Sequence, residues 1–365
     1  MSATATGLLS DLAAARERTL ALVSHLDDDA LERQVDPLMS PLTWDLAHIA
    51  AYEDLWAVHR HAGLDLLHPE LAAIYDAFET PRAVRGKIEL LDADGAHEYL
   101  AEVRERTVAA AERHGVDPVI HEMVLRHELQ HTETMRQAMH LGGALPHGEP
   151  ALNAVDGPER WVDIPGGAFA MGARGDGFAF DNELPRHRVE HAPFRIARRP
   201  VTNGTWMHFT EGGGYVRREW WSDEGWAWKE DEDIIGCPGA AAGHPDAPVC
   251  HVSWFEADAF ARYSGARLPT ESEWERAATW SQRDLTGMGS VWEWTSSRFG
   301  GYPGFRPFPY REYSEVFFGD DYRVLRGGSW ATHPRVGTTT FRNWDLPQRR
   351  QIFAGLRLAH DSKDS

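Results

Sequence analysis

The hydrophobic residues of the first 140 or so positions recur every three to four residues, a period typical of amphipathic α-helices. Ser40 and Pro41 are typical of a helix start, as a capping residue followed by proline at the first helical position, and Gly63 is typical of the corresponding end. Similar signals, such as Asp94 and Gly115, bound the other stretches. The pattern therefore predicts helices at residues 8–26, 40–63, 94–115 and 117–143.

Helices of this length, with one longer connection between the second and the third, predict a four-helix bundle, a fold that places metal sites between facing helices. Residues 141–160 are rich in Gly, Pro and Ala, which is typical of a linker. We therefore predict one domain at residues 1–145 and a second at residues 146–365.

The second part of the chain has a different pattern, because from Trp161 onward glycine, tryptophan and short strand-like runs replace the helical period. The only clear helices there are predicted at residues 254–264 and 270–280, the second opened by a capping box of Thr270 with Glu273. With 15 tryptophans in the chain, we expect much of the remainder to be irregular and held by aromatic side chains. The predicted fold class is α+β multidomain.

Composition narrows the class of protein. The 365 residues, 42% of them hydrophobic, suffice for two separate cores. A formal net charge of −19 argues against nucleic acid or an anionic membrane as the main partner. The sequence shows neither a signal-peptide pattern nor an apolar run of about 18 residues, so we expect a cytoplasmic protein without a membrane span.

Three histidines are the main candidates for chemistry. His127 and His131 lie four residues apart on the fourth predicted helix, so both imidazoles face the same side. Such a pair is a weak signal by itself in a chain with 19 histidines. A third imidazole from a neighbouring helix would complete a three-histidine cap that leaves metal positions free for water, oxygen or substrate, which is a catalytic arrangement.

His48 supplies that third imidazole in this interpretation. It lies on the same stripe of the second predicted helix as Trp44 and Tyr52, a stripe that faces the core. A histidine on such a stripe needs a partner. The partner is either a carboxylate, such as Glu128 or Glu133, or a metal shared with the histidine pair.

Motifs of the second half resemble a known family. Five segments in order along the chain look like the formylglycine-generating-enzyme fold, a variant of the C-type lectin fold: residues 161–172, 199–203, 265–274, 291–295 and 324–330. The N-terminal bundle with its histidines resembles the DinB superfamily. Together they make residues 8–360 similar to the non-haem iron sulfoxide synthases of ergothioneine biosynthesis.

The resemblance implies a reaction and its partners. In that family, Fe(II) held by three histidines couples a thiol and O2 with N-α-trimethylhistidine, forms a C–S bond at imidazole C2 and oxidises the sulfur to a sulfoxide. His48, His127 and His131 would hold the iron between the two domains. The thiol would be γ-glutamylcysteine or cysteine, and the protein would be a monomer or a homodimer.

Substrate-binding roles also follow from the resemblance. Gln130 matches the glutamine that hydrogen-bonds the histidine substrate, although an exposed helical glutamine is the simpler alternative. Arg82 and Arg85 match the arginine pair that binds the carboxylates of γ-glutamylcysteine, a task for which a guanidinium with two parallel donors is suited. A solvated pair of loop arginines is the alternative.

The C-terminal part supplies the other side of the implied pocket. Asp345 would meet the ammonium of the sulfur donor, while Asn343 and Trp344 would line the pocket of the trimethylated histidine, whose quaternary ammonium favours aromatic faces. The family also uses a tyrosine as proton donor. Tyr310 is favoured for that role by its place in the motif, with Tyr302 and Tyr313 as alternatives.

One departure and several alternatives remain. Residues 281–290 directly bridge a stretch where family members carry some tens of residues, so the exact substrate and the oligomeric contacts are open.

Related enzymes attach cysteine to histidine or use a selenosugar to make selenoneine. A formylglycine-generating oxidase is disfavoured because it needs paired reactive cysteines near the end of the fold, whereas Cys237 and Cys250 lie earlier. These two residues are interpreted as semi-buried thiols, with a single bridge still possible. A metal-holding, ligand-binding module is the non-enzymatic alternative.

Overall fold

The computed structural model describes residues 3–148, 152–157 and 159–362. The chain divides into two compact units, Met1–Glu149 and Pro150–Ser365, and each is described by itself. Among the described residues, no helix is both long and apolar enough to cross a membrane.

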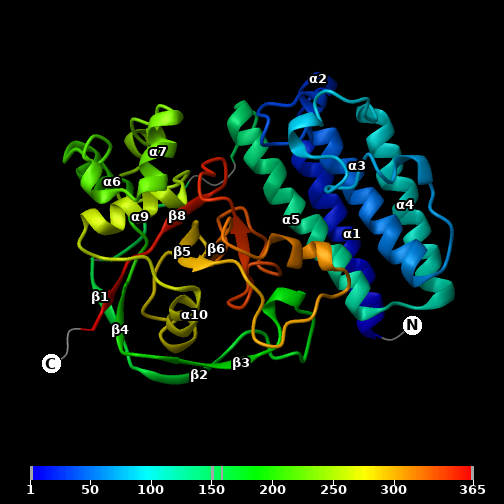
Figure 1. The fold of residues 1–365 in the computed structure, drawn as a ribbon. Coiled ribbons are helices and arrows are strands. Elements are labelled where there is room, and N and C mark those ends of the chain that lie inside the picture. The colour runs from blue at the N-terminus through cyan, green and yellow to red at the C-terminus, as the bar shows by residue number, and fades with distance from the viewer. Residues whose placement is uncertain (1–2, 149–151, 158, 363–365) are drawn as a thin grey trace. The chain divides into compact units, whose positions relative to one another are not determined.

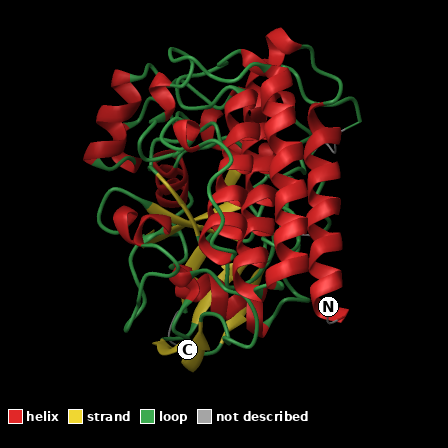
Figure 2. Cartoon of the chain, turned by 90° about the vertical axis from the view of Figure 1, so that its right-hand side faces the viewer, coloured by secondary structure: helices red, strands yellow, loops and turns green. Residues whose placement is uncertain are grey.

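The first unit is a bundle of long helices, which run alongside one another in Figures 1 and 2. Helix α3 packs against α4 and α5, and α1 packs against α5. Helix α3 continues directly as a π-helix, and the connection to α4 contains two short 3-10 helices. The helices are α1 (Ala3–Val23), α2 (Asp28–Glu32), α3 (Leu42–Glu53), the π-helix (Asp54–His61), the 3-10 helices (Pro69–Leu71 and Arg82–Val84), α4 (Ala93–His114) and α5 (Pro118–Gly142).

Helix α1 spans Ala3–Val23, so it begins and ends several residues before the predicted range 8–26. The predicted starts of α3 and α4 are wrong by one or two residues, and both for a local reason. Helix α3 is capped by Pro41, because the hydroxyl of Ser40 accepts a hydrogen bond from Arg85 instead of closing the helix. Helix α4 is capped by the carboxylate of Asp92 and not by Asp94. The start of α5 at Asp117-Pro118 and its end at Gly142-Gly143 are as predicted.

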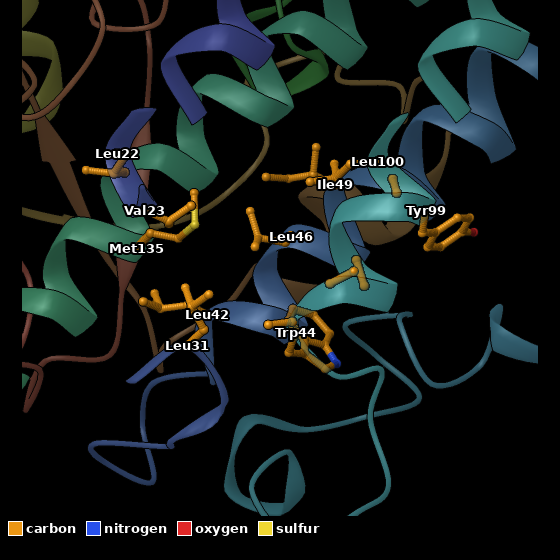
Figure 3. Packing of buried hydrophobic residues seen from close by; sticks show 14 of the residues in the cluster. Leu22, Val23, Leu31, Leu42, Trp44, Leu46, Ile49, Tyr99, Leu100 and Met135 are labelled. Carbon is orange, nitrogen blue, oxygen red and sulfur yellow. The ribbon is translucent and has the colours of Figure 1, made fainter. Parts of the chain in front are cut away.

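The core of the first unit lies between these helices and is shown in Figure 3. Leucines and other apolar side chains from α1, α3, α4 and α5 interlock there, as the helical period requires. The labelled members are Leu22, Val23, Leu31, Leu42, Trp44, Leu46, Ile49, Tyr99, Leu100 and Met135.

Short strands and helices make up the second unit. One sheet has the order β1-β4-β9, β2 and β3 form a hairpin, and a third sheet has the order β7-β6-β5-β8, in which only β5 and β8 are parallel to each other. The strands are β1 (Trp161–Ile164), β2 (Gly167–Met171), β3 (His187–His191), β4 (Phe194–Ala197), β5 (Trp292–Arg298), β6 (Arg323–Arg326), β7 (Asn343–Asp345), β8 (Ala354–Leu356) and β9 (Ala359–Asp361).

Two of the helices in this unit were predicted. Helices α9 and α10 begin and end within one residue of the prediction, and the capping box of Thr270 with Glu273 is present. The prediction that α9 and α10 are the only clear helices of this unit is wrong, because α6 and α7 also form, each with nine residues and a capping hydroxyl. The remaining helices are α6 (Asn203–Glu211), α7 (Asp223–Asp231), α8 (Pro238–Ala242), α9 (Trp254–Tyr263), α10 (Glu271–Trp280) and the 3-10 helices Asp181–Glu183, Arg218–Trp220, Arg311–Tyr313 and Glu315–Phe317.

The short connection between α10 and β5 is well packed. Leu285 is buried against Ile164, Ile196 and Ala277, side chains of two strands and of α10. The buried guanidinium of Arg357 donates to the carbonyl of Thr286, at 3.0 Å, in the same connection. The connection therefore contributes to the core of the unit.

The two cysteines, Cys237 and Cys250, are buried and form no disulfide with each other, so the possible bridge is not present. The Cys237 sulfur lies 3.5 Å from the carbonyl oxygen of Cys250. Burial raises the pKa of the Cys237 thiol to about 11, which keeps it protonated at neutral pH. A protonated, buried thiol is a poor nucleophile.

Candidate metal centre

The bundle brings together the three histidines singled out above. His48 comes from α3, and His127 and His131 come from successive turns of α5. One ring nitrogen of each lies within 4.8 Å of the others, and the Nε2 atoms of His48 and His127 are 3.1 Å apart. Three imidazole nitrogens therefore converge on one point.

Hydrogen bonds on the far side of two rings determine which nitrogen faces that point. The Nδ1 of His48 lies 2.6 Å from the carbonyl oxygen of Tyr75, which can only accept, so this nitrogen carries the proton. The Nδ1 of His131 lies 2.9 Å from a carboxylate oxygen of Asp45, a fully buried residue. With Nδ1 directed at an oxygen acceptor in each ring, Nε2 is the nitrogen left for a metal, the usual arrangement of a metal-binding histidine.

Burial favours the neutral, metal-binding form of two of the imidazoles, those of His48 and His127. It lowers the pKa of His48 well below its ordinary value, and the nearby His131 lowers it further. The same two causes, with His48 as a third, lower the pKa of His127. Neutral imidazole is the form that ligates metal, so the donor set suits a divalent transition-metal ion and leaves coordination positions open.

The carboxylate alternative for His48 does not hold for Glu128. That carboxylate accepts hydrogen bonds from Arg16, Arg104 and Thr19 within the bundle, at 2.8–3.3 Å. It is therefore paired with arginines, and His48 finds its partners in the Tyr75 carbonyl and His127.

Aromatic rings flank the histidines. The Trp44 indole is stacked on His48 with ring centroids 4.6 Å apart and 14° between the planes. Tyr52, one turn after His48 on α3, is stacked on His127 with ring centroids 3.6 Å apart and 8° between the planes. Such close packing restricts rotation of the imidazoles and shields one side of the site from water.

The two arginines of the predicted donor site have different environments. Arg82 is exposed at the start of its 3-10 helix, whereas Arg85 is 4% exposed. The Arg85 guanidinium donates to the Ser40 hydroxyl and the Thr80 carbonyl at 2.8 and 2.9 Å, and burial lowers its pKa to about 9. Gln130 is half-buried on α5 and lies one turn from His127.

The predicted residues of the second unit lie on β7 and in the loops before it. Trp344 is stacked on Phe299, with centroids 4.2 Å apart and 7° between planes, while Tyr313 meets its edge at 5.9 Å. The Asp345 carboxylate lies 3.5 Å from the buried guanidinium of Arg349. Convergence of these side chains with the histidines of the first unit stays a prediction.

The three tyrosines also differ in environment. Tyr302 is buried under the guanidinium of Arg342, 4.2 Å from its ring centroid, and burial raises its pKa. Tyr310 and Tyr313 are half-buried, with centroids 6.3 Å apart. Their accessibility suits proton transfer to a substrate better than that of Tyr302.

Sequence reasoning missed the partners that orient the ligands. Asp45 lies on the same apolar helix as His48, and a charged residue amid such positions was an available signal. Tyr75 acts through its backbone carbonyl, and no side-chain pattern could have indicated it. Tyr52 was assigned to the core stripe, and its stacking on His127 depends on how α3 and α5 pack.

Comparison with known families agrees with the two-part architecture. Residues 11–140 match the DinB superfamily, and residues 147–286 and 281–362 match the sulfatase-modifying factor enzyme 1-like domain in two pieces. The two pieces overlap at residues 281–286, in the short connection after α10. Formylglycine-generating enzyme from Streptomyces coelicolor is 37% identical over 39% of this chain and 55% of its own length.

Two longer matches span nearly the full chain. Hercynine oxygenase from Mycolicibacterium thermoresistibile is 41% identical over 429 aligned positions, covering 97% of this chain and 94% of that protein. Hercynine oxygenase from Mycobacterium tuberculosis is 42% identical, covering 97% of this chain and 98% of its own length. The non-enzymatic alternative is thereby set aside. With a DinB-like helical unit, a formylglycine-generating-enzyme-like unit and these relatives, the chain belongs to the hercynine oxygenase family, the sulfoxide synthases of ergothioneine biosynthesis.

Proposed function

We propose that the chain is an Fe(II)- and O2-dependent sulfoxide synthase that joins a thiol to the imidazole C2 of hercynine, which is N-α-trimethylhistidine. The observation that carries the proposal is the convergence of three imidazole nitrogens, two of them oriented from behind by Tyr75 and Asp45. His48, His127 and His131 would hold the iron. A bound ferrous ion supplies the one-electron chemistry that activates O2.

The chain's own residues then position the reactants. Gln130 hydrogen-bonds the substrate imidazole, and Asn343 with Trp344 receives the quaternary ammonium, which cannot donate a hydrogen bond and favours an aromatic face. Tyr310 donates its phenolic proton to oxygen as O2 is reduced. Holding the substrates in contact converts a reaction of several molecules into an effectively unimolecular one.

Arg82 and Asp345 select the sulfur donor in this proposal, with Arg85 as the second cation of the predicted pair. γ-Glutamylcysteine carries two carboxylates and an ammonium, which these charges complement. Because only Arg82 of the pair is exposed, cysteine with its single carboxylate is the second candidate donor. A selenosugar, which is neutral, would use none of these charges.

The test is a side-by-side assay of the iron-loaded protein, prepared without oxygen and then exposed to air. Hercynine is offered with γ-glutamylcysteine, cysteine or a selenosugar, and products are identified by mass. We expect the γ-glutamyl sulfoxide, and we expect His127→Ala to lose most of its iron while the bundle stays folded. Full iron retention in His127→Ala would overturn the ligand set, and product from the selenosugar alone would overturn the thiol donor.

A further inference from the structure

Arg85 has contacts that a donor-binding role does not require. It ends the 3-10 helix that begins at Arg82, and its side chain turns into the bundle, where it is 4% exposed. Besides Ser40 and the Thr80 carbonyl, it donates to the carbonyl of Ala77 at 3.4 Å. Three directed hydrogen bonds fix the plane of the guanidinium.

That plane is in contact with Trp44. The central carbon of the Arg85 guanidinium lies 3.3 Å from the centroid of the indole, a close cation–π contact. Trp44 is fully buried and is stacked in turn on His48, 4.6 Å away and nearly parallel. The guanidinium of Arg85 therefore contacts the indole of Trp44, which in turn contacts the imidazole of His48.

The backbone carbonyls of two consecutive residues fix the indole and the imidazole relative to each other. The Trp44 Nε1 donates to the carbonyl of Ile74 at 3.0 Å, and the His48 Nδ1 to the carbonyl of Tyr75 at 2.6 Å. A single hydrogen bond leaves an imidazole free to swing about the line joining the two atoms. A stacked neighbour removes that freedom, and Arg85 packs against the neighbour.

We propose that Arg85 is a positioning residue for the metal ligand His48, acting through Trp44. It holds the indole against the imidazole, so that the His48 Nε2 keeps its direction toward the metal. This inference rests on the proposed metal-binding role of the three histidines, and it assigns Arg85 a task that needs no contact with substrate.

Cobalt(II) binding to the purified full chain tests the proposal without turnover. Cobalt(II) is titrated into wild type, Arg85→Met, Arg85→Lys and the control Arg82→Met, and its visible absorption bands report both affinity and ligand geometry. Loss of a residue that orients a metal ligand typically weakens binding by about 10–100-fold. We expect Arg85→Met to weaken cobalt binding by at least about tenfold with altered bands, Arg85→Lys to restore little, and Arg82→Met to match wild type.

The outcomes separate this inference from the proposed function. If wild type itself binds no cobalt, or if His127→Ala binds it equally well, the metal centre is wrong. If wild type binds and folded Arg85→Met shows the same affinity and bands, Arg85 does not position His48. If Arg85→Met does not fold, Arg85→Lys decides, and wild-type bands in that variant overturn the proposal. An equal loss in Arg82→Met also overturns it, because the effect would then belong to the loop as a whole.

Discussion

Individual hydrogen bonds orient the candidate ligands, and that of Asp45 is the clearest to test. Its buried carboxylate accepts the Nδ1 proton of His131 at 2.9 Å. Asp45→Asn keeps the shape but removes the charge, so we expect metal affinity to fall about tenfold while the fold persists. A metal titration measures it, with Asp94→Asn, an exposed acid of the same unit, as the control. Unchanged affinity would mean that the Asp45 charge is irrelevant to the ligand.

Tyr310 carries the next prediction. If its hydroxyl supplies the proton, Tyr310→Phe keeps iron and substrate binding but diverts the reaction from C–S coupling toward simple thiol oxidation. The measurement is the ratio of sulfoxide product to oxidised thiol. Tyr313→Phe is measured in parallel, because Tyr313 is an alternative donor whose ring is stacked on Phe180 at 4.5 Å. An unchanged ratio in Tyr310→Phe would move the role to Tyr302 or Tyr313.

The sequence predicts those residues of the site whose side-chain direction follows from their spacing along a helix. His127 and His131 face the same side because they are four apart on a helix, and the histidine on α3 follows from the apolar stripe. The supporting contacts could not be predicted in this way. Tyr75 and Arg85 lie in a connection without periodicity, and their positions depend on how that connection folds over α3.

Helix packing in the first unit depends on a buried ionic network. Arg16 from α1 and Arg104 from α4 both bind Glu53 on α3 and Glu128 on α5, at 2.7–3.3 Å. Glu53 adjoins Tyr52, and Glu128 adjoins His127. The network therefore fixes the register of the two helices that carry the histidines.

Removing one arginine of this network should lower the stability of the folded protein. We expect Arg104→Met to lower the free energy of unfolding by about 3–5 kcal/mol, because it leaves the two buried carboxylates of Glu53 and Glu128 to share the single charge of Arg16. Denaturant unfolding measures it. Arg113→Met, at an exposed position of the same helix, is the control and should change stability by less than about 0.5 kcal/mol. A loss as small as that in Arg104→Met would contradict the prediction.

The same network predicts a pH dependence. Burial would raise the pKa of Glu53, but Arg104 and Arg16 outweigh it and hold that pKa at about 2, below the ordinary 4.5. A depressed carboxylate pKa stabilises the fold above pH 4.5, and this stabilisation is lost as the pH falls from 4.5 toward 2. We expect wild type to lose stability in that window and Arg104→Met to lose less. Parallel pH profiles of the two proteins would rule out Glu53 as the cause.

Elements with strong periodicity or complete end signals could be predicted, and others could not. Helix α5 has both a capping aspartate with proline and a terminal glycine pair, and its bounds agree. Helices α6 and α7 are only nine residues long, so the apolar period had little more than two turns in which to appear. The sheet order also escaped prediction, since β8 pairs with β5 from far along the chain.

Arg82 carries the prediction on donor selection. Losing one charged hydrogen bond to a bound carboxylate costs roughly 1.5–3 kcal/mol, or about one to two decades in affinity. We therefore expect Arg82→Ala to raise the apparent KM for the thiol donor at least about tenfold, with little change for hercynine. Titration of each substrate measures this, with Lys87→Ala, an exposed cation of the same connection, as the control. A loss that falls equally on both substrates would show that Arg82 only orders its loop.

The packed connection after α10 bears on which segments of the second unit a member of this family can lose or gain. The alignment with the M. thermoresistibile relative spans 429 positions, whereas this chain has 365 residues, and the two pieces of the domain match overlap at residues 281–286. Leu285 closes the core at that point, and the carbonyl of Thr286 binds Arg357. We propose that the extra positions of the longer alignment fall at this connection, where they would form an accessory module outside the minimal scaffold. The module could then be removed from a longer relative by replacing it with this short connection. Conversely, a new recognition loop could be inserted into this chain at the connection.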